Sequence, residues 1–200
     1  NALDDGPSMV VFDYQTSRAG AHARAFLQDW RGHLMVDDYV GYKALLAAGP
    51  TELACLAHIR RKFFDVHAAS GSPVAEEALR HIAQLYAIEQ KATGMTPPQR
   101  LELREQHAGP ALAELHVWLL ATQRTVAAGS GTAKAIEHAL KRWPALQRSP
   151  SSGTMPLDNN PDKTAKSSIA NGNKHRRVTG QSHAGARTAA PPSVQRPTPH

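Results

Sequence analysis

The first third of the chain alternates short apolar runs with stretches that have the helical period. Three apolar runs have the length of buried strands: residues 9–12, 34–36 and 53–57. Two stretches between these runs repeat apolar positions at helical spacing: residues 19–31 and 39–48. Ser17 is a candidate N-cap for the first helix, and Gly49-Pro50 ends the second. Strands that alternate with helices predict an α/β arrangement.

From residue 72 to residue 143 the helical period continues without a strand signal. Ser72-Pro73 joins an N-cap to a proline at the first helical position, and residues 96–99 have the capping-box pattern. One apolar stripe follows Pro73: Ala78, Leu79, Ile82, Leu85 and Tyr86. We expect Gly109-Pro110 to break the helical run and Thr132 to cap the last helix. These patterns predict an α/β core with a helical insertion, or two subdomains.

The net charge of +6 is located in one part of the chain. Residues 161–200 hold seven of the 23 Lys and Arg residues but one of the 17 acidic residues, so the rest of the chain is balanced. This segment is rich in Pro, Ser, Thr and Gly and has almost no large apolar residues, which predicts a disordered tail. A basic tail favours nucleic acid through counterion release, and a solvated tail without a partner fits equally well.

The composition narrows the class of protein further. Two hundred residues, 41% of them apolar, can bury one globular core, and no apolar run is long enough to cross a membrane. No secretory signal pattern stands at the start, which is Asn1. The single cysteine, Cys55, excludes an internal disulfide and favours a cytoplasmic location. Cys55 and His58 have the spacing of half a zinc site, but we expect Cys55 to pack as a small apolar residue.

Two acidic pairs stand beside predicted strands. Asp37-Asp38 directly follows residues 34–36, and Asp4-Asp5 precedes residues 9–12. Ligands gather at the carboxyl edge of an open α/β sheet, and carboxylates from neighbouring strands suit Mg²⁺. Acidic pairs at strand ends are also common turn formers, so the pattern alone leaves both interpretations open.

A basic run extends from His58 to Lys62. Arg60, Arg61 and Lys62 are contiguous, so in a helix they cannot all share one face. The run fits contacts with a phosphate backbone, and it equally fits the solvated start of a helix.

Four blocks of sequence then occur in order: Val11–Arg18 (VFDYQTSR), Val36–Tyr42 (VDDYVGY), Cys55–Phe64 (CLAHIRRKFF) and Leu157–Pro161 (LDNNP). Together they resemble the transposases of the insertion sequence 66 family over residues 4–160. The resemblance implies an RNase H-like core, a mixed sheet with flanking helices, interrupted by an all-helical insertion. It also implies cleavage and strand transfer of transposon DNA by two Mg²⁺ or Mn²⁺ ions, held by two aspartates and one glutamate.

The family's acids can be carried over to particular residues. Asp37 matches the second catalytic aspartate, and Asp4 matches the first, with Asp5 as the alternative. Both Asp4 and Asp37 are then expected to be metal ligands. The family's glutamate, three residues beyond the Asp-Asn-Asn block, corresponds to Lys163. Lysine cannot ligate a cation, and Asp162 is one residue early, so we expect this copy to be impaired.

The remaining expectations concern DNA. We expect nucleic-acid contacts from six residues: His58, Arg60, Arg61, Lys62, Asn159 and Asn160. The resemblance implies transposon ends and target DNA as partners, a cytoplasmic, nucleoid-associated location, and leaves a homo-oligomer open. We divide the chain into a partial catalytic core (1–70), a helical insertion (71–148), a remnant of the terminal catalytic element (149–165) and a disordered basic tail (166–200). The alternative function is a non-catalytic DNA-binding remnant that uses the tail.

Overall fold

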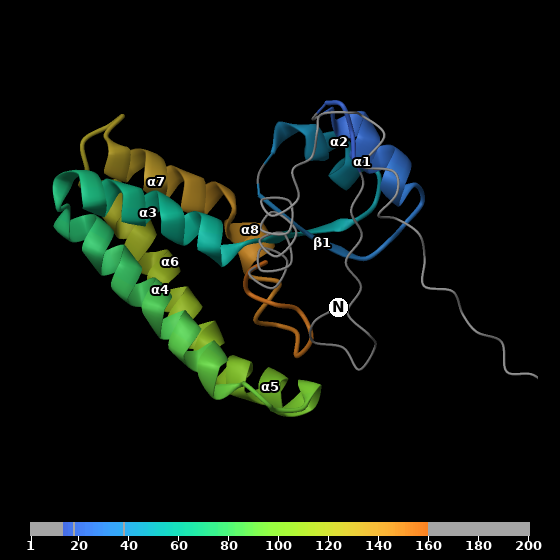
Figure 1. The fold of residues 1–200 in the computed structure, drawn as a ribbon. Helices are drawn as coiled ribbons and strands as arrows, with labels where there is room; N and C mark the ends of the chain where they lie inside the picture. The colour runs from blue at the N-terminus through green and yellow to red at the C-terminus, as the bar shows by residue number, and fades with distance from the viewer. Residues whose placement is uncertain (1–13, 18, 38, 160–200) are drawn as a thin grey trace, which may run out of the picture.

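The computed structural model describes residues 14–17, 19–37 and 39–159 and divides into a small α/β part and a helical bundle (Figure 1). The α/β part contains α1 (Gly20–Leu27), β1 (His33–Val36), η1 (Val40–Tyr42), α2 (Lys43–Ala47) and β2 (Thr51–Ala54). The helical part contains α3 (Leu56–Ser70), α4 (Pro73–Lys91), α5 (Pro97–Leu103), η2 (Arg104–Ala108), α6 (Gly109–Gln123), α7 (Gly131–Lys141) and α8 (Trp143–Leu146). The described part is therefore mostly helical.

The sheet of the described residues has two parallel strands, β1 and β2, with η1 and α2 forming the crossover between them. His33 pairs with Thr51 and Val36 with Ala54, so the strands are matched from end to end. The strand expected at residues 53–57 begins two residues earlier and stops at Ala54, because Leu56 already starts α3. An RNase H-like core needs more strands than these two. The strand expected at residues 9–12 lies outside the described residues.

Helix α1 differs from its expected form. It ends at Leu27 rather than Arg31, because Gln28 adopts a positive φ of 45° that stops the helix. Its N-cap is Ala19, and Ser17 makes no cap bond to the second or third helical N–H. The expected apolar stripe is not buried, since Phe26 is 54% and Trp30 41% exposed. Helix α1 packs through its N-terminal part, against η1 and α2.

Four helices close a bundle in which α3 contacts α4, α4 contacts α6, α6 contacts α7, and α7 returns to α3 (Figure 1). Apolar residues three and four positions apart on each helix meet in one core: Ile59 and Phe63 of α3, Ala78, Ile82 and Leu85 of α4, Leu112, Leu115 and Leu119 of α6, and Ile136 and Ala139 of α7. The predicted stripe of α4 is confirmed, with Leu79 and Tyr86 at its partly buried margin.

Two helix starts in the bundle have the expected caps, and a third is capped by a different residue. The Ser72 hydroxyl accepts from the Ala75 N–H over 3.3 Å, and Thr96 and Gln99 form the expected capping box. Ser130, rather than Thr132, caps α7 by accepting from the Ala133 N–H over 3.1 Å. A serine two residues earlier leaves Gly131 and Thr132 within the first helical turn.

The break expected at Gly109-Pro110 is wrong, because α5, η2 and α6 form one continuous helix. Residues 104–108 make a π-turn, in which the Gly109 N–H donates to the Arg104 carbonyl. A widened turn shifts the hydrogen-bond pattern by one residue just before Pro110, which has no N–H to donate. The proline is thus accommodated without ending the helix.

The α/β part is held to the bundle by ionic and backbone contacts as well as by the chain itself. Arg142 donates from Nη1 to Oε1 of Glu52 over 2.6 Å, and Arg148 donates to the Glu52 carbonyl over 2.6 Å. Glu52 lies on β2, whereas both arginines flank α8. None of the helices in the described part of the chain combines the length and apolarity that a membrane crossing requires.

Candidate functional site

The carboxyl ends of β1 and β2 define one edge of the sheet. Val36 and Ala54 are paired at that edge, so Asp37 and Cys55, the next residues, leave the two strands side by side. Asp37 is exposed, as a residue that must reach a ligand would be. Two of the four sequence blocks, those that contain Asp37 and Cys55, therefore meet at one edge, where ligands of parallel sheets are usually bound.

A third block, the Leu157–Asn159 segment, docks at the same edge. The Leu56 N–H, in the first turn of α3, donates to the Leu157 carbonyl over 2.9 Å. The Cys55 thiol donates from Sγ to Oδ1 of Asn159 over 3.2 Å. The segment thus satisfies a backbone N–H of the first turn of α3, which has no partner within the helix. The structure brings Asp37, Cys55 and Asn159 to one edge although more than a hundred residues separate the last two.

Asp158 anchors the docked segment from its buried side. Only 8% of the residue is exposed, and its Oδ2 accepts from the Tyr86 hydroxyl of α4 over 2.8 Å. Burial of the ring raises the pKa of Tyr86, and the hydrogen bond to the Asp158 carboxylate raises it further. Tyr86 was expected only as an apolar stripe residue, and nothing in the sequence pattern indicates its polar contact.

Two arginines hold the loop that leads into this segment. Arg104, fully buried, donates to the carbonyls of Ser149, Ser152 and Met155, and pairs with Glu89 of α4. Arg100, one turn earlier, donates from Nη1 to the Gly153 carbonyl over 2.8 Å. A Cβ on Gly153 would overlap the Pro97 carbonyl, so loop and helix are in close contact. The sequence shows these two arginines four residues apart, but the pattern was not interpreted as a contact with a distant loop.

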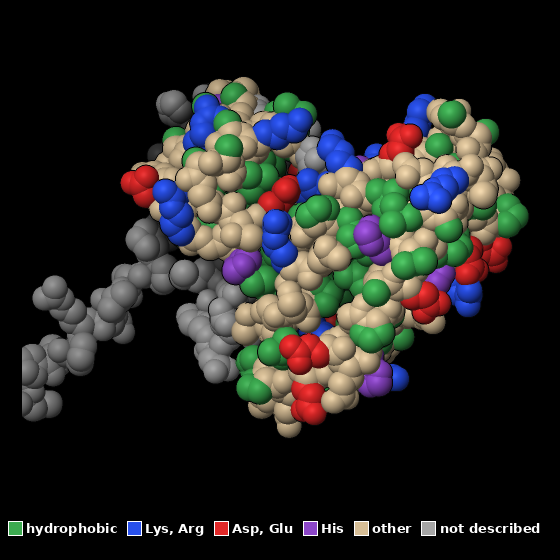
Figure 2. All heavy atoms as spheres, turned by 180° about the vertical axis from the view of Figure 1, so that it is seen from behind, with side chains coloured by type: hydrophobic (Ala, Val, Ile, Leu, Met, Phe, Trp, Pro, Cys, Tyr) green, Lys and Arg blue, Asp and Glu red, His purple; other side chains and the backbone are tan. Residues whose placement is uncertain are grey.

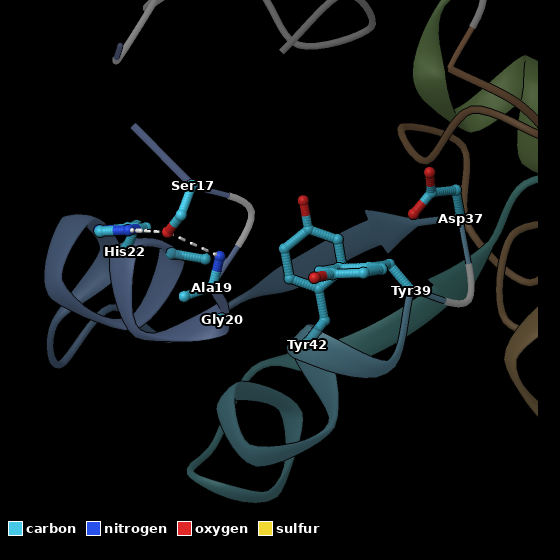
Figure 3. Close-up of a pocket in the computed structure, with 8 residues that line it drawn as sticks. Ser17, Ala19, Gly20, His22, Asp37, Tyr39 and Tyr42 are labelled. Atoms are coloured by element: carbon cyan, nitrogen blue, oxygen red, sulfur yellow. Dashed lines mark hydrogen bonds between the residues drawn. The ribbon is translucent and has the colours of Figure 1, made fainter. Parts of the chain in front are cut away.

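A cavity of about 180 Å³ lies between α1 and η1, and Asp37 is one of the residues that line it. It is lined by Ser17, Ala19, Gly20, His22, Ala23, Asp37, Tyr39 and Tyr42. Figure 3 shows Ser17 and His22 on one side of the cavity and Asp37 on the other, with the two tyrosines between them. The Ser17 hydroxyl and His22 Nε2 are 2.9 Å apart, and the tyrosine rings meet edge to face.

The basic run lies in the first two turns of α3. Arg60, Arg61 and Lys62 are exposed, whereas His58 is half-buried. The guanidinium carbons of Arg60 and Arg61 lie 5.8 and 6.0 Å from the centre of the Phe64 ring, within the range of a cation–π contact. The Arg61 Nε also donates to Asp65 over 2.7 Å. We refer to these exposed residues of α3, 60–62 with Phe64, as its basic face, although they are spread around the helix; they place cations beside an accessible aromatic ring.

Comparison with known proteins identifies the family. The family model described as "Transposase IS66 family" matches residues 1–185. The chain belongs to the IS66 transposase family. The match includes all four blocks quoted from the sequence, so the resemblance stated there is confirmed.

Three relatives of this IS66 family member come from Sinorhizobium fredii (strain NBRC 101917 / NGR234), each named an uncharacterized protein. The relative y4jD is 33% identical over 84% of this chain, y4hP 27% over 92%, and y4qI 31% over 77%. The alignments cover 36%, 36% and 30% of these relatives, so the chain spans about a third of their length. No solved structure matches the chain significantly.

Of the acidic residues expected from the resemblance, Asp37 is the one that lies within the described residues. Asp37 stands at the sheet edge, but Asp4, Asp5, Asp162, Lys163 and Asn160 lie outside the described residues. Within residues 14–17, 19–37 and 39–159, no group of three His, Cys, Asp or Glu residues could hold a metal ion.

Lysine and arginine are dispersed over much of the described surface. On the face drawn in Figure 2, Lys and Arg side chains are interspersed with Asp and Glu over both the α/β part and the bundle. This agrees with the balanced charge of residues 1–160. On this face the charges are therefore mixed rather than gathered into one broad positive patch.

Proposed function

We propose that this chain is a DDE-type DNA transposase, which cleaves transposon DNA and transfers its strands, in a copy impaired by Lys163. Membership of the IS66 transposase family is the observation that carries this proposal. The position of Asp37 at the carboxyl edge of β1 supports it, because that is where an acid from a parallel sheet can reach a ligand. The proposed action takes place in the cytoplasm at the nucleoid, with DNA as partner and a homo-oligomer as an open possibility.

The proposed metal ligands are Asp4 and Asp37. Their carboxylate oxygens are of the hard type that Mg²⁺ or Mn²⁺ prefers. The bound cations supply charge neutralisation for the phosphoryl group under attack. Asp37 is exposed and follows a strand directly, so its side chain is held by the sheet while its oxygens remain accessible.

The third position is where this copy departs from the family. Lys163 stands where a glutamate is expected, and its ammonium group has no lone pair with which to bind a cation. A positive charge beside a dication site also repels the ion. The chain therefore has two of three catalytic acids, and we expect weak metal binding and little or no strand transfer.

The proposed DNA contacts lie on either side of the start of α3. Arg60, Arg61 and Lys62 are exposed and can contact phosphates, and His58 lies at the border of this surface. Asn159 is the last residue of the segment that docks at the start of α3, and the proposal adds its amide and that of Asn160, the next residue in the sequence. Contacts of this kind fix the position of the DNA backbone and do not depend on its sequence.

Nicking of DNA that carries the transposon ends, with Mg²⁺ or Mn²⁺, tests the catalytic proposal. The parent chain is expected to show no or trace nicking, and Lys163→Glu to gain activity and Mg²⁺ affinity. Lys163→Met is the matched control, since it removes the charge without adding an oxygen ligand. Robust nicking by the parent chain, or equal activity of the two variants, would contradict the role given to Lys163.

A second candidate function rests on the charge of residues 161–200, which carry the whole excess of +6. In this alternative the chain is a non-catalytic DNA-binding remnant, and the tail supplies its affinity. A chain ending at residue 160 should then lose most of its DNA binding and show a shallower dependence on salt. Unchanged binding after truncation would assign the contact to the basic face of α3 instead.

A further inference from the structure

The cavity beside Asp37 is built by a close approach of two backbones. A Cβ on Gly20 would overlap the carbonyl oxygen of Gly41, so the start of α1 and the η1 turn touch without side chains between them. A Cβ on Gly41 would overlap the ring of Tyr39. Both glycines are therefore required for the cavity walls to stand where they do. The cavity is therefore formed by the backbone fold itself, between α1, which precedes β1 in the chain, and η1, which follows it.

The size of the cavity suits one small aromatic ring. Its volume is about 180 Å³, and an engineered cavity of about 150 Å³ accommodates a benzene molecule. A pyrimidine base has a single six-membered ring, whereas a purine has a fused pair. A volume of this size accommodates the single ring of a pyrimidine base.

The lining chemistry favours a base over a phosphate. Tyr39 and Tyr42 present two aromatic rings with centroids 5.5 Å apart and planes at 81°, so an incoming ring can stack on one and meet the edge of the other. The hydroxyl of Ser17, the ring of His22 and the carboxylate of Asp37 provide polar groups for the edge of a base. Among the described residues that line the cavity, there is no Lys or Arg that could hold a phosphate.

We propose that this cavity, between Tyr39, Tyr42 and Asp37, accepts one unpaired pyrimidine base of the DNA that the chain binds. The assignment rests on the proposed DNA-binding function and adds to it the form of DNA that is recognised. A base inside a duplex has its faces stacked and its edge paired, so it reaches such a cavity only when it is turned out of the helix. Aromatic side chains are the usual surfaces on which unpaired bases stack.

The test compares three labelled duplexes by fluorescence anisotropy with the 200-residue chain. The first contains a single unpaired thymine, the second an abasic site at the same place, and the third is fully paired. The chain should bind the first about tenfold more tightly than the second, which lies within the range that base stacking on an aromatic ring contributes. An unpaired adenine should bind less tightly than the unpaired thymine.

Variants at neighbouring positions separate stacking from folding. Tyr42→Leu should remove the preference for the unpaired thymine, and Tyr42→Phe should retain it because the ring remains. Val40→Ala is the matched control, since Val40 lies on the same turn, is 70% exposed and does not line the cavity. Far-ultraviolet circular dichroism of each variant confirms that the fold is intact.

The outcomes distinguish the assignment of the cavity from the proposed DNA-binding function on which that assignment rests. Equal affinity for the thymine and abasic duplexes, with binding otherwise intact, would overturn the cavity assignment and leave the DNA-binding function standing. Equal affinity for thymine and adenine would overturn the pyrimidine preference. No binding to any of the three duplexes would overturn the DNA-binding function, and the cavity assignment with it.

Discussion

Arg104 donates to both carboxylate oxygens of Glu89, from Nε over 2.8 Å and from Nη2 over 2.6 Å. The arginine belongs to the π-turn before α6, and the glutamate to the last turn of α4, so the pair joins two helices. The same guanidinium binds the carbonyls of the loop at residues 149–155. Since this loop leads to the docked Leu157–Asn159 segment, a contact inside the bundle fixes residues at the sheet edge.

Arg104→Met should destabilise the chain by about 3–5 kcal/mol, because it leaves a partly buried carboxylate and several carbonyls without their donor. Equilibrium unfolding in urea measures the change. The control is Arg80→Met, which removes the arginine of an exposed ion pair with Glu77, and both of these residues lie in α4. Its effect should be much smaller, because exposed ion pairs contribute little. Similar losses in the two variants would show that burial is not the cause.

Phe63 and Phe64 are adjacent but have opposite environments, 1% and 43% exposed respectively. Phe63→Ala should cost about 3–5 kcal/mol of stability, since it leaves a cavity in the core of the bundle. Phe64→Ala should change stability little. Thermal and urea unfolding of the two variants provide the comparison. A large loss of stability for Phe64→Ala would contradict the placement of its ring on the surface.

Arg60→Ala combined with Lys62→Ala should weaken DNA binding about uniformly across sequences. Each removed phosphate contact should lower the salt slope, the change in log affinity with log salt concentration, by about 1. The measurement is a titration at several salt concentrations. Lys91→Ala removes an exposed cation from the far end of α4 and serves as the charge control. An equal loss in the control would point to net charge rather than to the basic face of α3.

The Tyr86 hydroxyl should make stability fall at high pH. Because burial, together with the bond to Asp158, raises its pKa above the ordinary value of 10.0, the unfolded chain loses this proton before the folded chain does. The contribution is therefore fully present below about pH 10 and decreases as the pH rises above it. Tyr86→Phe should show a shallower decrease between pH 9 and 11 than the parent chain. Identical pH profiles would mean that Tyr86 does not resist ionisation in the fold.

Several features set by neighbouring residues were predictable from the sequence, although the caps expected at Ser17 and Thr132 were wrong. The caps at Ser72 and Thr96 and the apolar stripe of α4 depend on groups three or four positions apart, and they were confirmed. The break expected at Gly109-Pro110 was wrong because a π-turn accommodates the proline, and the sequence pattern gives no signal for such a turn.

The candidate site was predictable only in part, because several of its contacts join residues that are far apart in the sequence. Asp37 could be placed at a strand end because Val36 ends an apolar run. The docking of Asn159 on Cys55 joins residues 104 positions apart, and periodicity carries no information about such pairs. The cavity also escaped prediction, because it arises where Gly20 and Gly41 meet across two separate elements.

A single residue, Cys55, separates the end of β2 from the start of α3. A junction this short has no slack, and the Leu157 carbonyl ties its far side as well. The orientation of α3 is therefore fixed relative to β2 within a single residue of chain. Because Val36 pairs with Ala54, the first turn of α3 and Asp37 are both anchored at the same end of the two strands.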